Sequence, residues 1–427
     1  MTSGSLLLAS VLVLKGATVH PASGPAIPDG TVVVEDGRVV AVGGPELPVP
    51  EGAEVRDLAG KHLSPPLFVP ATALGLVEIA ALEPSVDVAE TAGPRPDSRP
   101  DAAMNLDSEL LPVARSGGLL HGLLVPSGSV LPGSAAAVRL NGWTREDACL
   151  ACPAAVVVEW PRMAIDRSKD ARPSARKQEK ARDEAISTIR TAFRDAAAYR
   201  RAKAAEASGG PVVPRDARLA ALVPALDGTV PLLVRARTKR EIEAVLRFVD
   251  EDLAAPPGQA PVRLVLLGAA DAWRLAPRLG ERKVGVVLDG TLVLPERPDE
   301  PYDTPFAAAG VLEKAGVLVA ITNGSDAGGA AQARELPVHA AVAAAHGLDR
   351  VAALRTITLN PARLFGLSAS LGSIEPGKEA SFALWSGDPL DGRSAVEALF
   401  DRGAELDLSD RQKRLRDRYR DRPKPGR

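Results

Sequence analysis

Short apolar runs bounded by turn-forming residues recur along most of the chain, and near the amino end they follow one another closely. Val-rich runs there alternate with Pro, Gly and Asp, a pattern typical of strands joined by tight turns. Asp36 and Gly37 stand between two such runs and predict a hairpin. The expected strands are residues 11–19, 31–35 and 39–42.

Through the middle of the chain, apolar runs alternate with longer segments of helical pattern, such as residues 238–252. Strands that alternate with helices favour a parallel sheet covered by helices. We therefore predict an α/β domain over residues 65–365. Its expected strands are residues 119–125, 154–159, 231–235, 263–267, 284–288 and 317–321.

Three segments stand outside this alternation. Residues 174–207 are rich in Arg, Lys, Ala and Glu and predict a helical insertion with a solvated surface, since acids interleave with the basic residues. Residues 411–427 carry nine basic and two acidic side chains, which predicts a polar helix with a disordered end; a phosphate-rich partner is the alternative. The apolar run at residues 6–14 is shorter than the roughly 20 residues of a membrane span, so it predicts a first strand or an atypical signal.

Composition narrows the class of protein. At 427 residues the chain has room for one large domain or for two to three ordinary ones. A hydrophobic content of 45% and a net charge of −2 indicate a globular protein and give no argument for a nucleic-acid or membrane partner. Two cysteines are too few for a disulfide framework. We expect a cytoplasmic protein, or an exported one if the amino-terminal run is a signal.

The stretch from Gly60 to Leu76 begins as a turn and then runs apolar, so it predicts a strand entering a core. This stretch also resembles the signature of the amidohydrolase superfamily, in particular its imidazolonepropionase-like and dihydroorotase-like enzymes. In that family a Gly-Lys turn leads into a strand that ends Pro-Gly-(apolar)-(apolar)-Asp-x-His-x-His-x-Gly. On this chain the two histidines fall on Ala71 and Ala73, and the aspartate falls on Val69.

Two later segments extend the resemblance. Residues 353–362 match the family's Ala-(apolar)-x-x-x-Thr-x-Asn-Pro-Ala helix, and residues 371–385 match the segment that returns from the barrel to a β-sandwich, with Ser381 at a usual Asp position. The resemblance implies an α/β fold, a (β/α)8 TIM-type barrel with a small β-sandwich domain formed by the N- and C-terminal segments. The implied boundaries are 1–64 and 366–400 for the sandwich, 65–365 for the barrel and 401–427 for a basic polar tail.

The metal ligands of the family are absent from the matching positions. Side chains two apart on a strand point the same way, so two histidines there could bind one ion, whereas Ala71 and Ala73 cannot. A later histidine position reads Arg235, whose guanidinium stays protonated and has no lone pair for a cation. The next reads Gly268. We therefore expect no cofactor, although the family norm is zinc or another divalent metal.

Asp326 is a catalytic position of the family that this sequence keeps. The family places an Asp after the eighth strand in a Gly-Ser/Thr-Asp segment, where it binds metal and acts as general base toward water. Residues 324–326 match this segment. The resemblance implies a catalytic role for Asp326, and a surface or cap residue is the alternative.

The remaining potential ligands form no metal-binding pattern. Cys149 and Cys152 have metal-like spacing, but no second pair completes a zinc site. We expect two buried small hydrophobes there, with a redox dithiol as the alternative. His339 and His346 are seven residues apart on one predicted helix, roughly 10 Å along its axis and too far for one ion. The other histidines are His20, His62 and His121.

The sequence leaves several functions open. The resemblance implies metal-assisted hydrolysis of non-peptide C–N bonds, often in cyclic amides, but the lost ligand positions predict a degenerate amidohydrolase that is inactive or impaired. Such a protein could bind a small molecule at the barrel mouth, where Arg235 and Arg237 could hold an anion, or form a homo-oligomer or a complex with an active homologue. The alternatives are a hydrolase with a relocated or metal-free site around Asp326 and a purely structural subunit.

Overall fold

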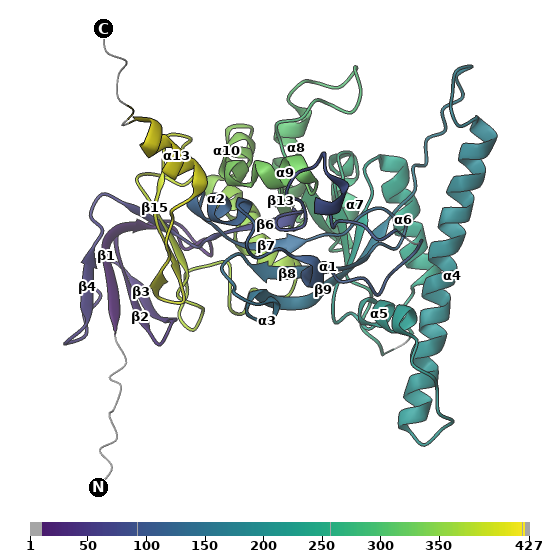
Figure 1. The fold of residues 1–427 in the computed structure, drawn as a ribbon, viewed down its shortest axis with the longest axis horizontal. Helices are drawn as coiled ribbons and strands as arrows, with labels where there is room; N and C mark the ends of the chain where they lie inside the picture. The colour runs from purple at the N-terminus through teal and green to yellow at the C-terminus, as the bar shows by residue number, and fades with distance from the viewer. Residues whose placement is uncertain (1–10, 92, 257, 421, 423–427) are drawn as a thin grey trace.

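The computed structural model describes residues 11–91, 93–256, 258–420 and 422, and these form two β-sheets with helices packed around one of them (Figure 1). The sheet at the left of Figure 1 contains strands from both ends of the chain, and the central one contains strands from the middle. The predicted fold class, an α/β barrel with a second β-region built from both chain ends, is confirmed.

The terminal sheet mixes early and late segments in its hydrogen-bonded order. That order is β16 (Ala404–Glu405), β15 (Val396–Asp401), β14 (Phe382–Trp385), β5 (His62–Ser64), β1 (Leu12–Val19), β2 (Ile27–Glu35) and β3 (Arg38–Gly43), with β4 (Glu54–Asp57) beside β1. The pairing of β5 with β14 joins the two ends of the chain. Asp36 and Gly37 form the predicted hairpin turn, and their φ angles of 48° and 72° suit the tight turn that matches strand twist.

The central sheet has eight strands arranged as a nearly closed barrel. Its order is β6 (Leu67–Thr72), β7 (Leu119–Leu124), β8 (Gly133–Arg139), β9 (Cys149–Glu159), β10 (Leu232–Arg235), β11 (Leu264–Leu267), β12 (Gly285–Leu288) and β13 (Val319–Ile321). β8 runs antiparallel to both of its neighbours, and the other strands are parallel. The barrel therefore departs from a regular (β/α)8 arrangement at one strand.

β13 and β6 are the two edge strands of the central sheet, and hydrogen bonds across the seam between them close the barrel. Some of these bonds come from residues 357–360, which precede β14. At one end of the seam, Thr322 Oγ1 donates to Ala71 O at 2.6 Å. At the other end, Asn360 Nδ2 donates to Val319 O at 2.7 Å. Phe68 N also donates to Ile357 O at 2.8 Å. These bonds satisfy polar groups at the two edges, which would otherwise be costly to bury.

Successive residues of each barrel strand point to opposite sides, and this alternation divides the core in two. The inner cluster takes every second residue, including Val157, Leu233 and Val287, from all eight strands. The outer cluster takes the intervening residues, such as Val158 and Val234, and packs them against the surrounding helices. The barrel interior is thus filled by apolar side chains up to the layer that contains the strand ends.

Helices surround the barrel and close its amino-terminal end. α6 begins at a capping box in which Thr238 and Glu241 satisfy each other's backbone amides. The segment matched to one family helix forms two short helices, α11 and α12, because the chain leaves helical geometry at Thr358. These helices are α1 (Pro100–Ala103), α2 (Leu110–Ser116), α3 (Arg145–Ala148), α5 (Ala217–Leu226), α6 (Lys239–Asp252), α7 (Ala276–Glu281), α8 (Thr304–Lys314), α9 (Ala327–Ala331), α10 (Leu336–Ala345), α11 (Arg350–Thr356) and α12 (Leu359–Leu364).

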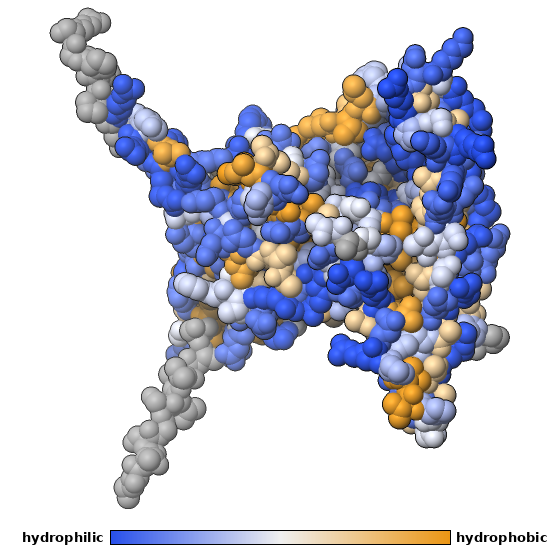
Figure 2. Space-filling model, turned by 45° about the vertical axis from the view of Figure 1, so that its right-hand side comes forward, coloured by the Kyte–Doolittle hydropathy of each residue, from blue (hydrophilic) through white to orange (hydrophobic). Residues whose placement is uncertain are grey.

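The predicted helical insertion is the 33-residue helix α4 (Ala175–Ala207), which extends beyond the body at the right of Figure 1. Only Ile189, Phe193 and Ala196 of this helix are buried, and they share one face because their spacing is four and then three residues. Phe193 packs edge-on against Phe248 of α6, with ring centroids 5.7 Å apart. The rest of α4 is charged and solvated, in keeping with the largely hydrophilic outer surface in Figure 2.

Two sequence expectations about the chain ends meet the limits of the described residues. The predicted first strand is present as β1, whereas residues 1–10, which include most of the candidate signal, lie outside the described residues. The predicted polar helix of the tail is α13 (Arg411–Arg420), and the end expected to be disordered, 423–427, also lies outside them. Within the described part of the chain, none of the helices has the length and apolar character to cross a membrane.

Cys149 and Cys152 form a disulfide within β9, so the expectation of two buried small hydrophobes is wrong. Their Cα atoms are 6.1 Å apart, within the range that a disulfide spans. The register between β8 and β9 shifts beside them, which brings two residues three apart in sequence close enough to bond. Sequence spacing alone does not report this bulge.

Candidate ligand site

Charged side chains stand at the barrel mouth, where the parallel strands end. Val157, Leu233 and Val287 belong to the inner cluster. By the two-residue alternation, Glu159, Arg235 and Asp289 point into the mouth above them. Glu159 and Arg235 are the last residues of β9 and β10, and Asp289 directly follows β12. The inner cluster therefore ends in a polar layer on the side where such barrels place their chemistry.

Arg235 forms an ion pair with Glu159 across this layer. Its Nε lies 3.5 Å from Glu159 Oε1, and each side chain is about a quarter exposed, at 29% and 27%. Burial raises the pKa of the Glu159 carboxyl, and the Arg235 guanidinium opposes that rise. Arg235 is therefore partly neutralised within the protein.

The carboxyl of Asp289 is closely surrounded at the mouth, and its surroundings shift its pKa. Burial raises the pKa of its carboxyl, against the opposing effect of Arg235 and Arg237 and with a further rise from Asp326. Its Oδ1 is buried and has no hydrogen-bond partner among the described residues. A methyl group built on Gly268 would lie 2.9 Å from Asp289 Oδ2. The carboxyl of Asp289 thus occupies the space beside Gly268.

The backbone just after Asp289 is held by His339 of α10. Thr291 N donates to His339 Nδ1 at 3.1 Å, so this nitrogen is the acceptor and the ring proton sits on Nε2. Burial lowers the pKa of His339, which keeps the imidazole neutral for this role. His339 lies outside the predicted site residues, and the structure shows it as a support of the mouth.

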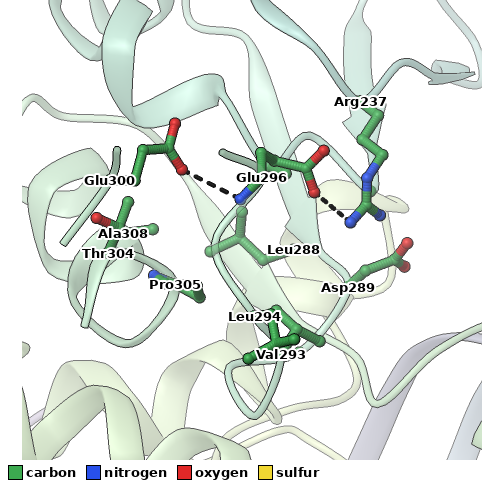
Figure 3. A pocket seen from close by; sticks show the side chains of 13 residues that line it. Arg237, Leu288, Asp289, Val293, Leu294, Glu296, Glu300, Thr304, Pro305 and Ala308 are labelled. Carbon is green, nitrogen blue, oxygen red and sulfur yellow. Dashed lines mark hydrogen bonds and ion pairs between the residues drawn. The ribbon is translucent and has the colours of Figure 1, made fainter. Parts of the chain in front are cut away.

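Arg237 lines the same cavity as Asp289 and pairs with the long loop between β12 and α8. Its Nη2 donates to Glu296 Oε1, and this bond raises the pKa of Arg237. Glu296 N in turn donates to Glu300 Oε2 at 3.1 Å (Figure 3). The loop is fastened further by Arg297, whose Nη2 lies 2.6 Å from the fully buried carboxylate of Asp271.

A small cavity opens between Arg237 and this loop (Figure 3). The cavity has a volume of about 50 Å³, which suits a small group of a few heavy atoms. Asp289, Glu296 and Arg237 give it a polar wall. The facing wall is apolar and consists of Leu288, Val293, Leu294, Pro305 and Ala308.

The structure separates two positions that the sequence places on one face. Ala71 packs in the inner cluster, whereas Ala73 packs in the outer one, and both are fully buried. The pairing of β6 with β7 shifts register between Val69 and Thr72, and the strand ends at Thr72. Because β6 ends at Thr72, the strand alternation that relates positions 71 and 73 in the sequence does not extend to Ala73.

Asp326 uses its side chain to cap a helix. Its Oδ1 accepts from Gly329 N at 2.8 Å, so it serves as the N-cap of the short helix α9. Asp326 is near enough to Asp289 to raise the pKa of that carboxyl. The structure thus brings Asp326, Arg235 and Arg237 to the same mouth as Asp289, with both arginines already paired to acids.

The mouth does not fit the divalent metal that the resemblance implies. Of the four implied histidine positions, two are buried alanines, one is an arginine paired to an acid, and one is a glycine with a carboxyl beside it. Among the residues that the structure describes, no group of three or more His, Cys, Asp or Glu side chains is arranged to hold a metal ion. A cation would also meet the charges of Arg235 and Arg237.

Comparisons with known proteins agree with this architecture. The sequence model described as the amidohydrolase family matches residues 303–408, which include Asp326. An amidohydrolase from Thermotoga maritima MSB8 has a similar structure, with a TM-score of 0.78 and 24% identity, covering 92% of this chain and 99% of that chain. No curated protein matches the sequence.

Two further solved structures share the fold at lower similarity. Phenylurea hydrolase B gives a TM-score of 0.52 at 16% identity, over 93% of this chain and 97% of that chain. A β-aspartyl dipeptidase from Fervidobacterium islandicum AW-1, in complex with a β-Asp-Leu dipeptide, gives 0.52 at 15% identity over the same shares. Likeness at these identities establishes the fold and leaves the chemistry to the site residues.

Proposed function

We propose that this chain, which has the fold of the amidohydrolase superfamily, binds a small ligand at the barrel mouth. It does not use the metal-assisted hydrolysis that is typical of that fold. The family match over residues 303–408 and the shared fold support the superfamily. The observation that carries the proposal is the pairing of Arg235 with Glu159 at an implied ligand position. An arginine there can bind a ligand and cannot bind a metal.

The polar wall of the cavity indicates the character of the ligand. Arg237 is already paired with Glu296, so a free anion would have to displace a carboxylate. Burial raises the pKa of the Asp289 carboxyl, and its Oδ1 has no hydrogen-bond partner among the described residues, so this side chain can accept a hydrogen bond from a ligand. A small neutral group with donor and acceptor atoms, such as an amide, fits this wall better than the anion expected from sequence.

Metal content tests the first half of the proposal. The purified protein is loaded with zinc, dialysed and measured by elemental analysis. We expect less than about a tenth of an equivalent, because a zinc site needs at least three protein ligands. Near one equivalent that persists in His20→Ala and is lost in Asp289→Asn would overturn the proposal, since it would place zinc at the mouth.

Acetamide tests the second half, because it is a small neutral amide that suits the cavity. We expect acetamide to raise the thermal unfolding midpoint of the wild type. It should not change the midpoint of Asp289→Leu, because Leu removes part of the polar wall. Lys314→Gln, a change on an exposed part of α8, serves as the control. An equal effect of acetamide on all three proteins would contradict a mouth site.

Hydrolysis without a metal is the second candidate, and the raised pKa of Asp289 favours it because catalytic acids and bases often have shifted pKa values. The names of the fold neighbours suggest β-Asp-Leu dipeptide and a phenylurea as first substrates. Release of product by the metal-free protein, abolished in Asp326→Asn or Asp289→Asn, would establish this candidate and remove the non-catalytic one.

A further inference from the structure

A second hollow lies at the opposite end of the barrel, where β11 and β12 begin and α12 ends. The hollow has a volume of about 380 Å³, which is within the range of small-molecule sites. Its walls come from four basic side chains and from apolar strand ends. They are Val249, Pro261, Val262, Arg263, Leu264, Val265, Arg282, Lys283, Val284, Gly285, Leu318, Arg363 and Leu364.

The charge of this hollow is one-sided. Arg263, Arg282, Lys283 and Arg363 line it, and none of its lining residues is acidic. The whole chain has a net charge of −2, so this gathering of cations does not follow from composition. A concave wall lined by one sign of charge concentrates small ions of the opposite sign.

Two of the four cations are held in place by the protein. Arg263 donates from Nε to Gly228 O and from Nη2 to Thr229 O, both at 3.1 Å. Arg282 makes two bonds to the carboxylate of Asp250, one of them at 2.9 Å. These contacts position the guanidinium groups, and the one with Asp250 cancels part of the charge.

The other two cations have no such partners. Among the described residues, the side chains of Lys283 and Arg363 have no hydrogen-bond or ion-pair partner, and the backbone of Lys283 donates to Gly280 O at 3.0 Å. The charge of Arg363 lowers the pKa of Glu375 without a direct bond between them. A cation near a helix C-terminus is favoured by the helix dipole, which accounts for Arg363 at the end of α12. It does not account for Lys283, which has a φ of 53° in the region that favours glycine.

We propose that this hollow binds a small organic phosphate, with Lys283 and Arg363 as its principal contacts. Arginine forks match phosphate oxygens and lysine supplies a point charge, so the two unpaired cations suit one phosphate group. Val249, Val262 and Leu318 form an apolar wall for the organic part of the ligand. This site lies at the other end of the barrel strands from the mouth and does not depend on the function proposed there.

Calorimetric titration with adenosine monophosphate, inorganic phosphate and adenosine tests the proposal on the full chain. We expect adenosine monophosphate to bind most tightly, inorganic phosphate more weakly and adenosine not measurably, with affinity falling as salt is raised. Lys283→Asn and Arg363→Gln should each weaken binding about tenfold, because each removes a charge-assisted contact. Asn tolerates the left-handed φ of residue 283, so this variant should keep the fold.

Lys314→Gln is the matched control, since it removes one exposed lysine from outside the hollow and should bind as the wild type does. Equal affinity of the wild type and both hollow variants would overturn the proposal, as would equal binding of adenosine and its monophosphate. Binding to phosphatidic acid vesicles without binding to adenosine monophosphate would also overturn it, because the phosphate would then be a lipid headgroup.

Discussion

Arg139, the last residue of β8, forms a buried ion pair with Asp401, the last residue of β15. This pair links the floor of the barrel, which is the end opposite the mouth, to the terminal sheet. Both side chains are only 4% exposed. Arg139 Nη2 also lies 2.7 Å from Glu379 Oε2, which lets one guanidinium bind two carboxylates. The antiparallel direction of β8 places this arginine at the floor, whereas a parallel strand would end at the mouth.

Replacing Arg139 with Met should destabilise the protein by about 3–5 kcal/mol, because it leaves a buried carboxylate without its partner. Urea unfolding measures the free energy difference. Lys61→Met breaks the exposed pair with Glu397, in which both side chains are 37% exposed, and should cost less than about 1 kcal/mol. Similar costs for the two variants would show that the Arg139 pair does not hold the two sheets together.

Gly268 and Gly316 allow the crowding beside Asp289 to be separated from backbone strain. Their φ angles are 77° and 79°, but a methyl group on Gly316 would meet no atom within 4 Å. Both Ala variants should lose about 1–2 kcal/mol from the left-handed backbone. Gly268→Ala should lose more, because the methyl group meets Asp289 Oδ2 at 2.9 Å. Urea unfolding of both variants checks this.

The excess cost of Gly268→Ala should vanish when Asp289 is also replaced by Ala, since the atom that the methyl group meets is then gone. An excess that persists in the double variant would mean that another neighbour resists the methyl group. If the excess does depend on Asp289, a histidine at position 268 could not enter the mouth without displacing that carboxyl.

Sequence pattern predicted most barrel strands because each is a run of apolar residues bounded by turns. It missed β8, whose residues Gly133–Arg139 are mainly small and alanine-rich and include only one β-branched side chain, Val138. It also missed the shift of register between Val69 and Thr72 in β6. Bulges of this kind depend on the partner strand, so a local pattern does not contain them.

The candidate site was predicted in part. Arg235 and Asp326 were placed by the resemblance, and both lie at the mouth. Glu159 and Asp289 were missed, although each stands at the end of a predicted strand, two residues beyond an inward apolar position. Reading the first polar residue at the carboxyl end of every strand would have found them, because that end of a parallel barrel faces one site.

Asp289 should make the protein less stable as pH rises. Burial raises the pKa of its carboxyl in the folded state above its value in the unfolded chain, so the folded protein binds more protons than the unfolded chain between those two pKa values. The stability that this carboxyl contributes is therefore fully present at pH values below its pKa in the unfolded chain. It is lost as the pH rises through its pKa in the folded protein. Asp289→Asn should remove this loss and be more stable than the wild type at neutral pH. Urea unfolding at several pH values measures the difference, and a variant that loses stability with pH as the wild type does would contradict it.

His20 should have the opposite dependence on pH. Its Nε2 lies 2.8 Å from His62 Nδ1, and burial lowers its pKa from 6.5 to about 4, with Asp388 opposing and His62 and Arg350 adding to the decrease. Between these values the unfolded chain binds more protons, so stability is full above about pH 6.5 and is lost as pH falls toward 4. The loss should be on the order of 2–3 kcal/mol in the wild type and absent in His20→Gln. Urea unfolding from pH 4 to 7 compares the two proteins, and a titration of the His20 ring by NMR with a midpoint near 6.5 would show that burial does not act on it as argued.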